Sequence, residues 1–84
     1  MKCKKYITET KIFTASSSTD TNCNSVIFVN TGTSNVTVDG LQLTPNQSLN
    51  ITGNENEVNV KIYYFNFTGA GVNSLTVLYK RYID

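Results

Sequence analysis

Hydrophobic and polar side chains alternate along most of this chain with a period of two residues. Such alternation is typical of β-strands with one face buried. No segment has the 3.6-residue period of an amphipathic helix. Strand-like segments, rich in β-branched and aromatic residues, occupy residues 4–14, 25–30, 36–43, 48–53, 58–67 and 74–83. The pattern therefore predicts an all-β fold: one domain over residues 1–84, built as a small antiparallel β-sandwich or barrel of six to seven strands.

The clearest local signal is a two-residue hairpin turn at Asp39-Gly40. Asp-Gly favours the positive backbone dihedrals that a tight hairpin requires, and short apolar segments flank it. In such a turn Val38 lies opposite Leu41, and Val36 faces Leu43 on the same side of the ribbon.

Other turns divide the remaining strands. Gly32 can supply a positive φ after the apolar run 25–30, and Pro45 pre-sets the turn at residues 44–47. The polar segment 15–25 predicts an exposed loop, because Ser, Thr, Asn and Asp side chains compete with regular backbone pairing. Leu49 and Ile51 should point inward from the short strand that follows Pro45.

Residues 58–67 predict the longest strand, whose second half is apolar on both faces. One face would fill the domain core, and the other must be covered or remain an exposed apolar patch. Three interpretations stay open for the aromatic side chains: packing in a closed barrel, a subunit interface, or a sugar-stacking platform. The residues that we select as interface candidates are Tyr6, Ile12, Phe13, Tyr63, Phe65, Phe67 and Tyr82.

Composition narrows the classes of partner. Only 15% of the residues are charged, where about a quarter is typical, and the net charge is +1. Nucleic acid is not expected as a partner, because phosphate binding needs clustered Lys and Arg. The basic residues gather near the two ends, so a modest basic patch forms if the first and last strands pair. Such lysines either discourage edge-to-edge aggregation or dock the protein on an acidic partner.

Residues suited to catalysis are scarce. The chain has no histidine, so the commonest general base and metal ligand is missing, and Cys3 and Cys23 have no such partner to activate a thiol. Glu55 and Glu57 lie near two asparagines but lack the spacing of a calcium loop. We expect no enzyme activity, no cofactor and no metal site.

Targeting signals are also missing from the pattern. Residues 1–15 lack the apolar segment of a signal peptide, and no apolar run approaches the ~20 residues of a membrane helix. We therefore expect synthesis in the cytosol, free thiols and no membrane partner. A Cys3–Cys23 disulfide is the alternative if the first two strands are neighbours.

The segment FVNTGTSNVTVDGLQLTPNQSLNI, with VNVKIYYFNF and the closing LTVLYKRYI, resembles small β-rich virion proteins of tailed bacteriophages, notably crAss-like phages of gut bacteria. Their shared pattern is an Asn-Thr-Gly turn, a V-x-V hairpin, an L-x-P turn and a terminal basic-aromatic strand. The resemblance covers roughly residues 26–83, and the proline turn reads Pro45-Asn46 where the family often has Pro-Gly. It implies a capsid auxiliary, decoration or head-fibre role without catalysis.

We therefore expect a non-enzymatic virion structural protein, made in the host bacterial cytoplasm. Its partners would be the major capsid protein or other virion proteins, together with further copies of itself, a trimer among the options. Residues 1–14 are the expected docking strand, since edge strands pair readily with another chain. The alternative is a glycan-binding module on a tail or fibre. A bacterial surface adhesin domain is a third option, weakened by the missing signal peptide.

Overall fold

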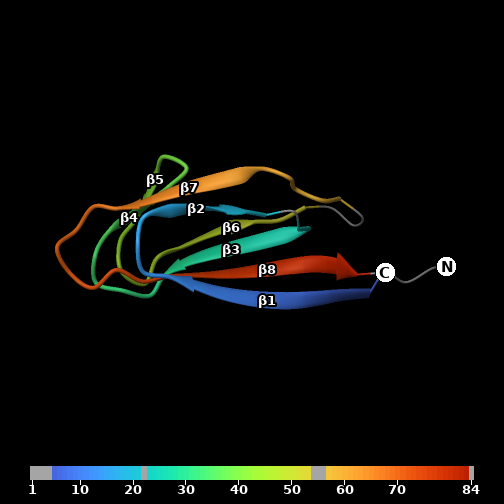
Figure 1. Ribbon diagram of the computed structural model, residues 1–84, viewed down its shortest axis with the longest axis horizontal. Coiled ribbons are helices and arrows are strands. Elements are labelled where there is room, and N and C mark those ends of the chain that lie inside the picture. The colour runs from blue at the N-terminus through green and yellow to red at the C-terminus, as the bar shows by residue number, and fades with distance from the viewer. Residues whose placement is uncertain (1–4, 22, 54–56, 84) are drawn as a thin grey trace.

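The protein is an open β-sandwich of two four-stranded antiparallel sheets. The computed structural model describes residues 5–21, 23–53 and 57–83 and places no helix among them (Figure 1). The strands are β1 (Lys5–Phe13), β2 (Ser17–Asp20), β3 (Ser25–Asn30), β4 (Val36–Val38), β5 (Leu41–Leu43), β6 (Ser48–Ile51), β7 (Ile62–Phe67) and β8 (Leu75–Ile83). The predicted all-β class is thus confirmed, and of the two predicted architectures, sandwich and barrel, the structure has the sandwich.

Each sheet takes strands from both halves of the chain. The first sheet has the order β1-β8-β3-β6, and the second has the order β2-β7-β4-β5. The first and last strands pair along their whole length, from Lys5 opposite Ile83 to Phe13 opposite Leu75. Figure 1 shows these two strands, blue and red, running together along one side of the molecule.

The core lies between the sheets and is filled by alternate residues of each strand. From the first sheet, β3 and β8 turn their apolar positions inward; from the second, β4, β5 and β7 do the same. Buried hydrophobic members of this core are Cys23, Val26, Phe28, Val36, Val38, Leu43, Tyr63, Phe65, Leu75, Val77 and Tyr79. Leu49 and Ile51 pack against them partly buried, as their positions in the sequence predict.

The Asp39-Gly40 hairpin forms in the predicted register. Val38 pairs with Leu41 and Val36 with Leu43, while Asp39 and Gly40 have φ of 50° and 88°. Two positive φ values in succession are the mark of a type I′ turn.

The Pro45 turn also forms, with a hydrogen bond of 3.0 Å from the Gln47 amide to the Thr44 carbonyl. Asn46 adopts φ of 71°, a left-handed conformation that asparagine tolerates. Gly32 has no positive φ; glycine is required there because a Cβ would lie 2.2 Å from the Val72 carbonyl oxygen.

The predicted loop 15–25 is wrong in its centre, where β2 pairs with β7. Thr19, on this strand, and Thr21, just after it, are both buried. The Thr21 hydroxyl lies 2.9 Å from the Asn59 carbonyl oxygen and 2.8 Å from the Lys61 carbonyl oxygen, within hydrogen-bonding distance of both. Polar composition therefore hides a strand whose threonines are satisfied inside the sandwich. This addition raises the strand number above the six to seven that we expected.

The predicted strand 58–67 is also shortened. Before Ile62 the chain makes only an isolated bridge, between Asn59 and Cys23. The Lys61 amide donates to Asn59 Oδ1 at 2.9 Å, a local side-chain bond that competes with sheet pairing. The longest strands are instead β1 and β8, with nine residues each.

Candidate functional site

Strand β1 is a long sheet edge. It pairs with β8 on one side and with no described strand on the other. The other three edges are β6, β2 and β5, of four, four and three residues, against nine in β1. An unpaired edge presents a row of backbone donors and acceptors to which another strand can bind. The geometry therefore makes β1 the natural place for a second polypeptide.

The outer face of β1 continues this surface. Tyr6 and Ile12 are 54% and 64% exposed, and Leu78 of the neighbouring β8 is exposed beside them. Lys80 Nζ lies 4.7 Å from the centre of the Tyr6 ring, a distance suited to a cation–π contact. A shallow apolar hollow on the same face is lined by Thr8, Ser25, Ile27, Leu78, Tyr79 and Lys80.

The inner face of β1 is tied to the domain. The Phe13 ring packs on Phe65 of the other sheet, with ring centres 4.8 Å apart. Glu9 forms a 3.0 Å ion pair with Arg81, and the Arg81 guanidinium lies 4.9 Å from the Tyr79 ring centre. These contacts hold β1 in position while its free edge stays open.

The basic residues of the paired ends that the structure describes do not form one patch. Successive side chains of a strand point to opposite faces of the sheet. Lys11 of β1 and Arg81 of β8 therefore lie on the inner face of the first sheet, and Lys80 lies on the outer face. The first and last strands do pair, which was the condition for a basic patch, but strand alternation places their charges on opposite faces.

The predicted interface residues fall into three groups. Tyr63 and Phe65 are 5% and 3% exposed and belong to the core of their own domain, so selecting them as interface residues was wrong. Phe13 and Phe67 are partly buried against that core. Of the remaining members, Tyr6 and Ile12 are exposed, and Tyr82 is half-buried.

The exposed apolar face near β7 contains none of the residues that the sequence analysis chose as interface candidates. Its side chains are 45–76% exposed and recur at every second position: Val58, Val60, Ile62 and Tyr64. The alternation identified this face, but only the packing of the first sheet on β7 decides which of the two apolar faces becomes core.

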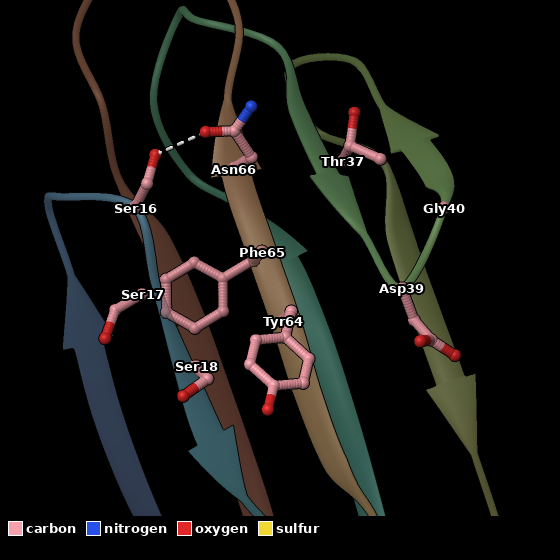
Figure 2. A pocket seen from close by; sticks show the side chains of 9 residues that line it. All are labelled: Ser16, Ser17, Ser18, Thr37, Asp39, Gly40, Tyr64, Phe65 and Asn66. Atoms are coloured by element: carbon pink, nitrogen blue, oxygen red, sulfur yellow. Dashed lines mark hydrogen bonds between the residues drawn. The ribbon is translucent and has the colours of Figure 1, made fainter.

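A shallow hollow of about 670 Å³ surrounds Tyr64 on the outside of the second sheet (Figure 2). Figure 2 shows the Tyr64 ring standing between Ser18 on one side and Asp39 on the other. Tyr64 is 65% exposed, so its ring face is open to a ligand. Ser16 donates to Asn66 Oδ1 at 2.9 Å at the upper rim. Four further residues complete the lining, namely Ser17, Thr37, Phe65 and, at the hairpin, Gly40.

Three titratable groups among the described residues have shifted pKa values, and two of them, Cys23 and Lys61, bear on possible chemistry. Burial raises the pKa of the free Cys23 thiol, although nearby Arg81 opposes the shift, so this cysteine is a poor nucleophile. Lys61 and Asp39 form an exposed ion pair, and the hydrogen bond to Asp39 raises the Lys61 pKa. Among the described residues, no three His, Cys, Asp or Glu side chains gather closely enough to hold a metal ion. Cys3 and Glu55 lie outside the described residues. The alternative Cys3–Cys23 disulfide and the acidic segment that contains Glu55 therefore both remain sequence-based predictions.

Comparisons with protein-family models, curated proteins and solved structures give no match for this chain. Within the described part of the chain, no helix is long and apolar enough to span a membrane. The site is therefore interpreted from its own geometry.

Proposed function

We propose that this protein is a non-enzymatic structural component of a tailed-phage virion, an auxiliary, decoration or head-fibre protein on the capsid. The observation that carries the proposal is the nine-residue edge of β1, which pairs with no described strand on its outer side and carries the exposed side chain of Ile12. Edge strands bind other polypeptides through backbone hydrogen bonds, and exposed side chains add specificity. The resemblance of residues 26–83 to phage virion proteins supplies the setting.

Many copies on a regular particle make such a contact effective. A short strand pairing is weak by itself, but simultaneous binding at several sites multiplies the apparent affinity. The low charge of the chain, with a net value of +1, lets copies lie close together without strong repulsion. The partners are the major capsid protein or another virion protein, and further copies of this chain.

Substitution at the exposed end of β1 tests this proposal. Removal of residues 1–14 would also remove Phe13 from its contact with Phe65, so that truncation would disturb the core. Ile12→Lys keeps the core intact and places a charge on the contact surface. Attachment of the purified protein to particles of the phage that carries its gene should fall at least about tenfold.

Val72→Lys is the matched control. Val72 is 65% exposed, as Ile12 is 64% exposed, but it lies in the loop between β7 and β8. Co-sedimentation with particles should be unchanged in this variant. Equal attachment of the two variants would show that β1 is not the contact strand.

The second candidate function is glycan binding on a tail or fibre, and the hollow around Tyr64 favours it. An exposed aromatic ring bordered by Asp39, Asn66 and Ser18 provides a stacking surface with polar groups for sugar hydroxyls. Tyr64→Ser should abolish binding to host polysaccharide, whereas Tyr6→Ser, at an exposed tyrosine of the other sheet, should retain it. Failure of the unmodified protein to bind any host polysaccharide would remove this candidate.

A further inference from the structure

The sequence of β1 is nearly symmetric about Thr10. Reading outward from that residue, Glu9 mirrors Lys11, Thr8 mirrors Ile12, and Ile7 mirrors Phe13. Each mirrored pair combines opposite charges, β-branched side chains or large apolar side chains. These are the kinds of residue that stabilise one another when they face across two antiparallel strands.

Geometry restricts how two copies of this edge can meet. A two-fold axis that makes two β1 strands antiparallel must stand perpendicular to the sheet, so each face continues into the same face of the other copy. Odd-numbered residues, including Glu9 and Lys11, then face odd-numbered ones, and even-numbered residues face even-numbered ones. In an antiparallel ladder, the backbone N–H and C=O groups of two facing residues either both point toward the partner strand or both point away from it. Pairing residues of equal parity satisfies this condition.

Charge separates the registers that remain. Centring the axis on Thr8, Glu9 or Lys11 opposes Lys5 to Lys11, Glu9 to itself or Lys11 to itself, respectively. Like charges directly opposite each other are destabilising. Centring on Ile7 pairs Lys5 with Glu9 but joins only residues 5–9.

We infer that β1 pairs with β1 of a second copy, in the register centred on Thr10. This register joins residues 7–13 of both copies and makes two Glu9–Lys11 contacts across the junction. It also sets Ile7 against Phe13 on the inner face and Thr8 against Ile12 on the outer face. The Glu9 carboxylate, which already accepts from Arg81 at 3.0 Å, has acceptor capacity for the second cation.

The resulting dimer is one sandwich continued through both copies. The first sheet extends across the two-fold axis with β1 and its copy at the centre, and both second sheets lie on the same side. The long free edge disappears, and the remaining edges have three or four residues each. This inference rests on the proposed function, for which it names the partner of the contact strand as a second copy of the chain.

Charge reversal tests the pairing directly. Glu9→Lys places only lysines at the two central contacts, and Lys11→Glu places only glutamates there. Each variant alone should dimerise at least about tenfold more weakly than the unmodified chain in sedimentation velocity. An equimolar mixture restores opposite charges at both contacts, so a heterodimer should form with an affinity near that of the original homodimer.

Lys5→Glu is the matched control. In the register centred on Thr10, Lys5 lies beyond the paired residues, so dimerisation should not change. In the register centred on Ile7, Lys5 faces Glu9, so the same variant would weaken the dimer. Loss of the dimer in Lys5→Glu would thus overturn the proposed register.

A cysteine pair measures the register without altering charge. Thr10 lies on the proposed axis, where facing Cβ atoms are close enough for a disulfide. In a Cys3→Ser background, Thr10→Cys should form a covalent dimer on mild oxidation, and Thr8→Cys on the same face should not. Because this measurement keeps Glu9 and Lys11, it stays informative even if a charge variant fails to fold.

The outcomes separate the two proposals. A monomer at every attainable concentration, no heterodimer in the mixture, or equal crosslinking at Thr8 and Thr10 would overturn the β1–β1 pairing. The virion role would survive that result if Ile12→Lys still lost attachment to particles, because β1 would then bind a different virion protein.

Discussion

The hydroxyl groups of Thr19 and Tyr79 share a hydrogen bond across the sandwich, joining β2 of one sheet to β8 of the other. Both side chains are buried, with Tyr79 only 1% exposed. A buried hydroxyl without a partner is costly, so this bond selects the position of β2 over the core. It also explains how a strand of Ser and Thr becomes part of an apolar sandwich.

Thr19→Val should lower the free energy of unfolding by about 1–3 kcal/mol, because the Tyr79 hydroxyl loses its partner in the core. Tyr79→Phe should have a similar cost. The double variant should cost clearly less than the sum of the two, since it leaves no unpaired hydroxyl. Urea unfolding of all four proteins measures the coupling, and strictly additive effects would show that the bond contributes nothing.

Stability should decrease in alkaline solution. Burial raises the pKa of Tyr79 above its ordinary value near 10, against the opposing effect of the Thr19 hydrogen bond, and burial likewise raises the pKa of Cys23. The unfolded chain therefore loses these protons first. The stabilisation is complete below the unfolded pKa values and is lost as pH rises through the folded ones.

Urea unfolding in steps from about pH 8 to pH 11 tests this expectation. The free energy of unfolding should fall over that range, and Tyr79→Phe should reduce the slope. A rise in stability with increasing pH across the same range would contradict the assignment of Tyr79 and Cys23 as buried neutral groups.

Asn30 should be among the most sensitive polar positions. Its side chain is fully buried, and Nδ2 donates to the Ser34 and Leu43 carbonyls at 2.8 and 2.9 Å, while Oδ1 accepts from the Gly32 amide at 3.1 Å. Asn30→Ala should cost about 2–4 kcal/mol, because three backbone groups lose their partner. Asn30→Asp should cost more at neutral pH, since a carboxylate would face two carbonyl oxygens.

Acidification distinguishes this explanation from simple loss of packing. Burial beside two carbonyl oxygens favours the protonated form of the carboxyl group introduced by Asn30→Asp, which then has one donor. The destabilisation relative to the unmodified chain should therefore shrink as pH falls from neutral and reach its smallest value near about pH 4, where the unfolded chain is protonated as well. Asn50→Asp, at an exposed position of β6, is the control and should change stability little. Equal costs for the two substitutions would contradict the role of the Asn30 amide.

Two glycines should respond differently to substitution by alanine. At Gly40, φ is +88° and a Cβ would meet no atom within 4 Å, so Gly40→Ala should cost only backbone strain, about 1 kcal/mol. At Gly32, a Cβ would lie 2.2 Å from the Val72 carbonyl oxygen, and the loop must move. Thermal unfolding should show the larger loss for Gly32→Ala, and the reverse order would contradict the loop packing.

The local elements could be predicted because their signals are short-range. The apolar run at β3, the Asp39-Gly40 turn and the Pro45 turn each carry their structure in a few residues. Leu75 and Val77 lie on one face of the alternating strand β8, and the structure buries that face.

The tertiary choices could not be predicted, because they depend on which strands meet. β2 has no apolar pattern and becomes a strand through its pairing with β7 and through the Thr19–Tyr79 bond. Both faces of β7 are apolar, so only the packing of the first sheet decides that Tyr63 is core and Tyr64 is exposed. For the same reason the interface candidates included core residues and omitted the exposed face.

We propose that this chain is a building block of a phage particle and acts by contact alone. Quantitative mass spectrometry of purified particles, from the phage proposed to carry the gene, tests this proposal. This chain should be present in many copies per particle and co-purify with the heads, and its amount should fall in Ile12→Lys but not in Val72→Lys. Purified particles that lack the chain, while it accumulates in the infected cell, would refute the proposal.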